Sequence, residues 1–302
     1  MLRLLETTAF RLLTGLWGVL APLCSHAVLL ASGDGTGNDS PIPGFDEYNL
    51  VGTIGSESGT YLGDGWVLTA NHVGTGDFVL GGTLHKFIPG TEYRLETSPG
   101  SGSDLLMFEV YPAPALPGIP IRSFSPIVGQ VTFMIGHGRN RGTATSFDPN
   151  GPSVAPPPLS GWHWGVGQSM RWGINVVSGF PAGPVLNTVS FLMDFDEFGG
   201  ALFESQATVG DSGGPVFIVN GFNESELAGI MIAVFGASGQ PSQTSLYTNG
   251  TAAARLDFYR DQILNQMAVP EPSRALPTAA AALALLARRR NAQRGAATAQ
   301  HR

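Results

Sequence analysis

The central part of the chain alternates short apolar runs with turns rich in glycine and proline. The runs contain many β-branched and aromatic residues, which is typical of buried strands. The clearest of them are 65–70, 105–110, 130–135, 215–219 and 227–235. No helical runs of about 10–15 residues alternate with these strands, so the pattern argues against a parallel α/β sheet and predicts an all-β fold.

Two segments differ from this pattern. Near the end of the β region, apolar residues recur at spacings of three and four, which predicts an amphipathic helix over 252–267. Its apolar stripe consists of Ala252, Leu256, Tyr259, Ile263 and Met267. Between the strands, the proline-rich segment 111–120 predicts a stiff, extended connector. The connector divides the β region into two halves, roughly 45–110 and 121–250.

Residues 1–27 have the pattern of a secretory signal peptide. Basic residues flank an apolar run, 12–23, and small residues follow it up to Ala27. A membrane anchor is the alternative, but the run is shorter than the ~20 residues that a span needs. Because Cys24 is the only cysteine of the chain, cleavage after Ala27 would leave a protein without disulfides.

The C-terminal segment 269–302 also has three parts. The string Val-Pro-Glu-Pro at 269–272 is followed by a small apolar run, 275–287, and then by three arginines, 288–290. This order resembles the PEP-CTERM sorting signal of Gram-negative bacteria. The resemblance implies transient membrane anchoring, cleavage by a sorting transpeptidase and delivery to the cell surface or extracellular matrix. A disordered alanine-rich tail is the alternative.

Charge and composition narrow the class of protein further. Hydrophobic residues make up 43% of the chain and charged residues only 13%, which excludes a disordered, solvated chain. The main domain, 28–268, carries 21 acidic and eight basic residues, so its net charge is −13, compared with −7 for the whole chain. This balance argues against nucleic-acid binding. Neutral or basic polypeptides are the expected partners.

Three polar residues beside the predicted strands are candidates for chemistry. His72 follows a strand, Asp104 precedes one, and Ser212 lies in the glycine-rich turn 210–215. A serine hydroxyl becomes a nucleophile when a base lies within hydrogen-bond reach and a carboxylate orients that base. Glycines beside the serine also let backbone N–H groups converge on one point.

Together these motifs resemble the trypsin/chymotrypsin-like serine peptidases. The resemblance spans about 45–268 and rests on the string Gly-Asp-Ser-Gly-Gly-Pro at 210–215 and on Trp-Val-Leu-Thr-Ala at 66–70 before the histidine. Leu-Tyr-Thr at 246–248 and the terminal helix add to it. It implies two antiparallel six-stranded β-barrels with the active site between them, and a peptide or protein substrate. The main domain, 28–268, is therefore expected to need no cofactor and no metal.

The resemblance also assigns roles residue by residue. It makes Ser212 the nucleophile, His72 the general base and later the acid, and Asp104 the group that holds the imidazole tautomer. The backbone N–H groups of Gly210 and Ser212 would form the oxyanion hole. The implied specificity pocket includes Gln206 at its floor, with Ile232 and Val234 across from it.

Two consequences of this alignment concern specificity and activation. Because Gln206 is neutral, a preference for Arg or Lys before the cut is not expected, and 230–234 is the expected edge strand that binds substrate backbone. In this family the aspartate before the serine, here Asp211, pairs with a newly cut α-amino group. Cleavage after Ala27 would supply that group at Val28. Local hydrogen bonds to Asp211 are the alternative.

Several features depart from the family or stay outside the alignment. Val73 and Val209 stand where secreted animal members have cysteines, and Ile232 lies near the place of a serine that supports the aspartate. A long insertion, 139–172, contains several tryptophans, which either form a binding lip or pack the loop down. The oxygen-rich segment 34–39 resembles a calcium loop but lacks its closing glutamate.

Together, these features of the sequence predict an exported serine endopeptidase. A non-catalytic surface or matrix binding module on the same fold is the main alternative. The presence of all three candidate residues argues against it, because binding alone requires none of them. A serine esterase would use the same three residues.

Overall fold

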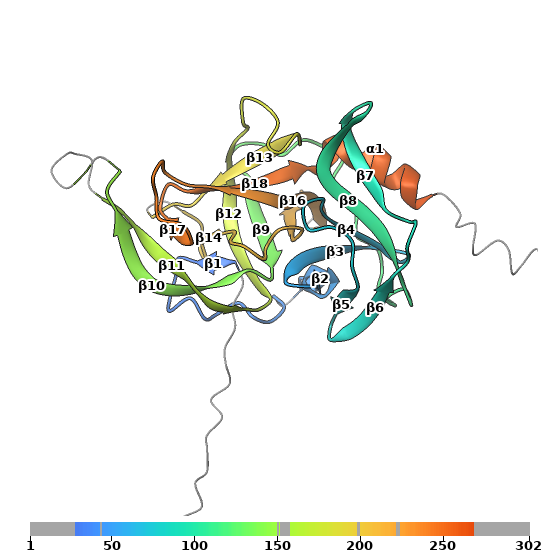
Figure 1. The fold of residues 1–302 in the computed structure, drawn as a ribbon, viewed down its shortest axis with the longest axis horizontal. Helices are drawn as coiled ribbons and strands as arrows, with labels where there is room; N and C mark the ends of the chain where they lie inside the picture. Colours follow the sequence, from blue (N-terminus) through green and yellow to red (C-terminus); the bar gives the residue numbers. More distant parts are fainter. Residues whose placement is uncertain are drawn as a thin grey trace, which may run out of the picture.

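Two β-barrels packed side by side make up the body of the molecule (Figure 1). The computed structural model describes residues 28–42, 44–149, 151, 158–197, 200–221 and 224–268. The predicted signal peptide and the predicted sorting tail lie outside these residues. Within the described part of the chain, no helix has the length and hydropathy to cross a membrane.

The first barrel closes through six antiparallel strands, because β4 pairs with both β3 and β8. In ring order the strands are β4 (Trp66–Ala70), β3 (Glu57–Gly63), β2 (Val51–Ile54), β5 (Phe78–Leu80), β6 (Thr83–Phe87) and β8 (Ser101–Tyr111). A short 3-10 helix, η1 (Asp46–Leu50), precedes it, and β7 (Tyr93–Ser98) pairs with β8 outside the ring.

The second barrel is also a closed ring of six antiparallel strands. In ring order these are β12 (Arg171–Gly179), β13 (Ser190–Asp194), β18 (Gly250–Arg255), β16 (Ser225–Phe235), β15 (Pro215–Val219) and β9 (Val131–Gly136). The predicted all-β fold with two six-stranded barrels is therefore confirmed.

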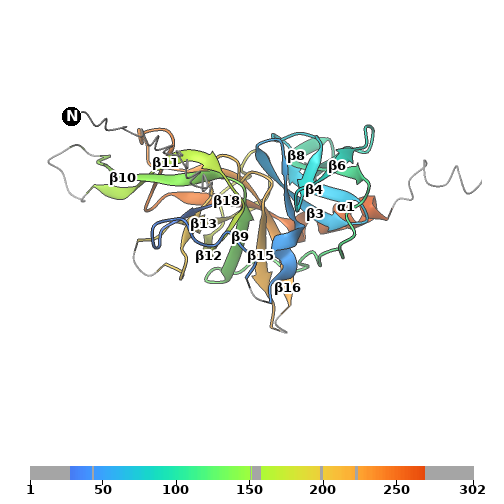
Figure 2. The ribbon, with the colours of Figure 1, turned by 90° about the horizontal axis from the view of Figure 1, so that it is seen from below.

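The predicted insertion forms a β-hairpin that projects from the second barrel (Figures 1 and 2). Its strands are β10 (Arg139–Phe147) and β11 (Leu159–Gln168), and β17 (Thr244–Leu246) pairs with β11. At the base of this sheet, β1 (Leu29–Leu30) pairs with β14 (Ser205–Gln206). The start of the described chain is thus tied to the second barrel.

The C-terminal helix α1 spans Leu256–Met267, so the predicted start at residue 252 is wrong. Gly250–Arg255 form β18 instead, because their backbone pairs with β13 on one side and β16 on the other. The small alanines of this strand are fully buried in the barrel, which satisfies the apolar pattern that suggested a helix. The helix then returns to the first barrel, where Gln262 exchanges hydrogen bonds with the backbone of Glu96.

One hydrophobic core joins the two barrels and fixes the loops between them. Leu68 and Phe108 of the first barrel belong to the same buried cluster as Phe217 and Ile230 of the second. Burying a side chain of this size contributes about 1.5–3 kcal/mol. The turns that carry His72 and Ser212, and the start of β8 that carries Asp104, lie where the two barrels meet, so their backbone is held from both sides.

Candidate active site

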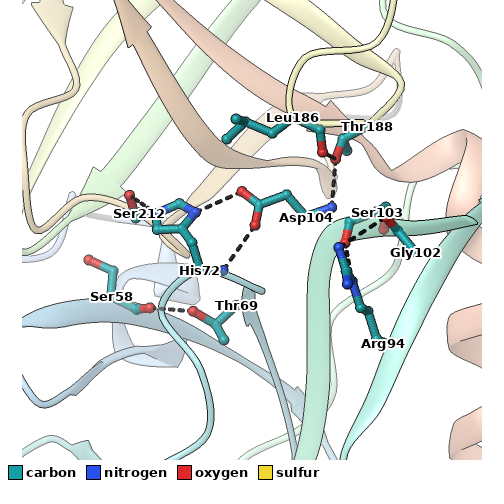
Figure 3. Close-up of polar contacts among 10 residues, drawn as sticks. All are labelled: Ser58, Thr69, His72, Arg94, Gly102, Ser103, Asp104, Leu186, Thr188 and Ser212. Carbon is teal, nitrogen blue, oxygen red and sulfur yellow. Dashed lines mark hydrogen bonds and ion pairs between the residues drawn. The ribbon is translucent and has the colours of Figure 1, made fainter.

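His72, Asp104 and Ser212 form one hydrogen-bonded line between the barrels (Figure 3). The Nδ1 atom of His72 lies 2.7 Å from Asp104 Oδ2, and its Nε2 atom lies 2.9 Å from Ser212 Oγ. The second carboxylate oxygen of Asp104 accepts a hydrogen bond of 2.9 Å from the backbone N–H of His72. The structure therefore brings all three predicted residues together from separate parts of the chain.

Strand pairing in the first barrel places the histidine opposite the aspartate. Ala70, the last residue of β4, pairs with Leu105 of β8, and the next N–H, that of Asn71, donates to the Asp104 carbonyl. Asp104 is only 5% exposed. Its hydrogen bond raises the pKa of His72 above the usual value, against the opposing effect of partial burial.

The second barrel supplies a contact to the aspartate that the sequence did not indicate. The hydroxyl of Thr188 accepts a hydrogen bond of 2.7 Å from the Asp104 backbone N–H and donates one to the Leu186 carbonyl. The side chain of Thr188 is fully buried. It thus fixes the backbone of Asp104 from across the interface, whereas Ile232 has no hydroxyl to offer. No motif marks Thr188, because its loop approaches β8 only in the folded chain.

Two glycines shape the turn around Ser212. Gly210 and Gly213 have φ values of +103° and +86°, where a side chain is strained. There is also no room: a Cβ at Gly213 would lie 2.1 Å from the Ser58 carbonyl oxygen. Within the described part of the chain, the N–H groups of Gly210 and Ser212 have no acceptor. They remain free to bind a ligand oxygen.

A buried serine in strand β3 of the first barrel binds this turn through hydrogen bonds. Ser58 donates its backbone N–H to the Ser212 carbonyl at 3.0 Å and its hydroxyl to the Gly210 carbonyl at 2.8 Å. The same hydroxyl accepts the backbone N–H of His137 at 2.8 Å. Ser58 is therefore a positioning residue for the turn, and no motif marks it in the sequence, because serines in strands carry no special signal.

Asp211 lies fully buried behind the turn and does not face the line of three residues. Its Oδ2 atom accepts hydrogen bonds from the N–H and the hydroxyl of Thr208, at 2.7 and 3.0 Å. Its Oδ1 atom accepts the N–H groups of Gly138 at 2.8 Å and of Val28 at 3.4 Å. Burial raises the pKa of the Asp211 carboxyl to about 7, so these bonds do not compensate the loss of water. Local hydrogen bonds and the Val28 nitrogen thus converge on the same carboxylate.

Gln206 lies at a cavity of about 260 Å³ beside β16. Its side chain is 1% exposed, its Nε2 atom makes a long contact of 3.5 Å to the Gly250 carbonyl, and its Oε1 atom has no partner within the described residues. Val234 and Trp164 also line this cavity. All of the residues that line it are uncharged, so the cavity is neutral.

The placement of Ile232 in this pocket is wrong. A bulge in β16 between Met231 and Ala233 turns the Ile232 side chain into the core between the barrels, where it is 2% exposed. The free edge of β16 is also shorter than predicted. Ile230 pairs with β15 and Met231 bonds to the serine turn, so only 233–235 pair with β18 alone among the described strands.

The tryptophans of the insertion contact neighbouring side chains and backbone of the described chain. Trp162 contacts the rings of Phe195 and Tyr247, at centroid distances of 6.1 and 5.4 Å. The indole N–H of Trp164 donates to the Ser245 hydroxyl. Trp172, which belongs to β12, donates to a backbone carbonyl and packs on an aromatic ring. These contacts favour the structural interpretation over a binding lip, although Trp164 also lines the cavity at Gln206.

Two further features lie away from the three residues. A larger cavity, of about 730 Å³, lies beside β5 and β6 and is lined by residues such as Tyr48 and His85. In the segment 34–39, the Asp34 carboxylate accepts both the N–H and the hydroxyl of Thr36, and these bonds lower its pKa. Within the described residues, no group of three or more His, Cys, Asp and Glu side chains lies together as metal ligands.

The fold has counterparts among solved structures. One is neuropsin, a serine protease expressed in the limbic system of mouse brain, with a TM-score of 0.50 and 18% identity over 76% of this chain and 98% of that one. The chain has the trypsin-like fold. Kallikrein-related peptidase 10 in complex with Zn²⁺ is also similar, with a TM-score of 0.48 and 16% identity over 73% of this chain and 96% of that one. The inactive form of the Rv3671c protease is similar too, with a TM-score of 0.43 and 14% identity over 74% of this chain and 89% of that one. No protein-family model matches the sequence, and no curated protein does.

Proposed function

We propose that the chain is an exported serine endopeptidase that acts through an acyl-enzyme intermediate. The observation that carries this proposal is the continuous hydrogen-bonded line from Asp104 through His72 to Ser212. A trypsin-like fold alone does not require these three side chains to meet. Their distances fall within the range in which a base can take the proton of a nucleophile.

In this mechanism His72 Nε2 accepts the hydroxyl proton as Ser212 Oγ attacks the substrate carbonyl carbon. The imidazolium then gives the proton to the leaving amine, and the peptide bond breaks. A water molecule then attacks the acyl-enzyme ester while His72 takes its proton, and His72 returns that proton to Ser212 Oγ as the acid product leaves. Asp104 keeps the Nδ1–H tautomer in place and stabilises the charged imidazole in both steps.

The N–H groups of Gly210 and Ser212 are the proposed oxyanion hole. Both lack a protein acceptor within the described chain, and the turn that carries them is held by Ser58. One preorganised donor of this kind contributes ~3 kcal/mol to transition-state stabilisation. Because the turn is fixed before substrate arrives, little of this energy is needed to reorganise it.

Removal of residues 1–27 during export is the proposed activating step. It would turn the Val28 nitrogen, which lies 3.4 Å from Asp211 Oδ1, into a charged amino group. A buried carboxylate with a pKa of about 7 gains strongly from a buried cation beside it. Val28 is itself only 1% exposed, so the pair would be shielded from water. The pairing therefore couples processing to the shape of the turn at Ser212.

The neutral cavity at Gln206 is the proposed binding site for the substrate side chain before the cut. Its unpartnered Oε1 atom favours a side chain that donates a hydrogen bond, and its apolar wall at Val234 and Trp164 favours uncharged ones. The free edge at 233–235 would pair with the substrate backbone. Arg and Lys are expected to be poor there, since no carboxylate lines the cavity.

Export and surface sorting belong to the proposal through the two ends of the sequence. The signal-peptide pattern supports secretion, and the PEP-CTERM-like tail supports transient anchoring and delivery to the surface of a Gram-negative cell. Signal peptidase and a sorting transpeptidase are the expected processing partners.

The proposal is tested by hydrolysis and by covalent labelling of the exported protein. Casein or a peptide library should be cut by the native chain, and Ser212→Ala should abolish cutting while the melting temperature stays nearly the same. Hydrolysis of esters without any peptide cleavage would favour the esterase. Binding to a matrix polymer without a fluorophosphonate adduct would favour the binding module.

A further inference from the structure

The inserted hairpin reaches back to the start of the domain through one arginine. Arg141 on β10 extends its guanidinium over the segment that follows β1. Its Nη1 atom donates to the carbonyls of Leu30 at 3.0 Å, Ala31 at 2.9 Å and Ser32 at 3.4 Å, and its Nη2 atom donates to the Gly33 carbonyl. One side chain therefore binds the backbone of four consecutive residues.

Residues of the insertion and of the N-terminal segment both pack against the Arg141 side chain. The Arg141 guanidinium lies 4.7 Å from the centre of the Trp162 ring, and Trp162 is packed in the aromatic cluster of the insertion. On the other side, Gly35 has a φ of +78° and a Cβ there would lie 2.5 Å from Arg141 Nε. Partial burial lowers the pKa of the guanidinium, as expected for a cation taken from water. The segment and the hairpin are thus shaped to each other at this point.

The segment that Arg141 holds leads directly to Asp211. Leu29 pairs with Gln206 and Leu30 with Ser205, and the Ala31 N–H donates to the Glu204 carbonyl. Val28 precedes these residues and places its nitrogen on Asp211. Beyond Leu30, the strand pairing ends and the carbonyls turn to Arg141. Any movement of the held segment would therefore be passed to Val28 within a few residues.

We propose that Arg141 is a positioning residue that clamps residues 30–33 and so keeps the Val28 amino group on Asp211. This inference rests on the proposed function, because it assumes processing after Ala27. The insertion then has a role of its own: it locks the N-terminal segment that shapes the serine turn. A lysine cannot replace the arginine fully, since its single ammonium cannot span four carbonyls.

The amines of the processed chain make this proposal measurable. Lys86 is the only lysine in the sequence, so a chain that begins at Val28 has two primary amines. Lys86 is well exposed and lies in the first barrel, paired with Asp77. Its reaction with an amine-acylating reagent is an internal reference, and mass spectrometry of peptides reports the reaction of Val28 separately.

The exported and processed protein, which begins at Val28, should be compared with its variants Arg141→Gln, Arg141→Lys and the control Arg139→Gln. Arg139 lies two residues away on the same strand, with an exposed side chain. In the native chain Val28 should be protected. Arg141→Gln should raise the Val28 labelling rate, relative to Lys86, by about tenfold or more, which corresponds to about 1.4 kcal/mol of opening free energy. Arg141→Lys should be intermediate and Arg139→Gln unchanged.

A second destabilised variant separates clamping from general loss of stability. Thr91→Val removes a half-buried hydroxyl of the first barrel that donates to the Ile88 carbonyl and accepts the Glu109 N–H, away from the N-terminal segment. At equal loss of melting temperature, it should leave Val28 protected. An equal Val28 rate in Arg141→Gln and the native chain would overturn the clamp, and so would a mature N-terminus other than Val28.

The same samples keep the two proposals distinct. If the native protein reacts with a fluorophosphonate and Val28 stays protected in Arg141→Gln, the clamp fails and the peptidase proposal stands. If no variant reacts with the fluorophosphonate but Arg141→Gln exposes Val28, the clamp stands and the peptidase proposal fails. When both hold, the fluorophosphonate rate should fall in Arg141→Gln and recover in part in Arg141→Lys.

Discussion

Replacing Ser58 with alanine should impair catalysis without touching any of the three reacting side chains. The change removes the hydroxyl that binds the Gly210 carbonyl at 2.8 Å and accepts the His137 N–H at 2.8 Å. Ser58 is fully buried, so water cannot replace either bond. A buried group left without its partner costs about 1–3 kcal/mol, and two such groups predict a loss of about 2–6 kcal/mol in the free energy of unfolding.

The catalytic effect follows from the position of the Gly210 peptide. Loss of a whole oxyanion donor lowers kcat by about 10²–10³-fold. Loosening that donor while its backbone stays in place should cost less, so we expect kcat to fall by about 10–100-fold. KM should change by no more than about threefold, because Ser58 does not reach the substrate surface.

The assay is steady-state hydrolysis of a chromogenic peptide, with the fraction of active enzyme set by fluorophosphonate titration. Thr132→Val is the control, since it also removes one buried hydroxyl donated to a backbone carbonyl. It should lower the melting temperature and leave kcat intact. If Ser58→Ala keeps kcat within about twofold of the native value, the serine does not position the turn.

Three further predictions address specificity, pH and processing. Gln206→Asp should create a preference for Arg and Lys before the cut, since an unpaired buried carboxylate favours a cation. If the native protein already cuts a peptide library mainly after Arg or Lys, the pocket assignment is contradicted. The hydrogen bond from Asp104 raises the pKa of His72 above 6.5, and only neutral His72 acts as a base. As pH decreases, kcat/KM should therefore fall with a midpoint above pH 6.5. A midpoint at or below pH 6.5 would be evidence against this hydrogen bond in the free enzyme. A chain with one methionine before Val28 should be less active and should lose stability, relative to the native mature chain, as pH rises from about 4 through 7. The reason is that Asp211 in this chain has a pKa of about 7 when folded, above the value of 3.8 in the unfolded chain, and has no ammonium partner when it ionises. If the two chains have equal activity and the same dependence of melting temperature on pH, Asp211 is a purely local structural residue.

The sequence contained enough to predict the barrels and the meeting of His72, Asp104 and Ser212. Each of the three stands beside a strand or a glycine turn whose geometry is dictated locally, and the string at 210–215 is specific. The supports of the site were not predictable. Ser58 and Thr188 act through contacts between barrels, and ordinary serines and threonines give no local sign of such contacts.

The errors have a common physical cause. The alanines of β18 fit a helical stripe as well as a buried strand, and only the pairing with β13 and β16 decides between the two. Regular alternation along β16 would put Ile232 on the same side as Val234, but the bulge beside it reverses the alternation of side chains. Arg141 shows the same limit, since its carbonyl partners lie more than a hundred residues away in the chain.

The central claim is that Ser212 is a nucleophile activated by His72. Its most direct test is reaction of the folded, exported protein with a fluorophosphonate, followed by intact-mass and peptide mass spectrometry. We expect one adduct per chain, on Ser212, and none in Ser212→Ala or His72→Ala at the same concentration and time. A folded native protein that forms no adduct, or forms one on another residue, would contradict the account.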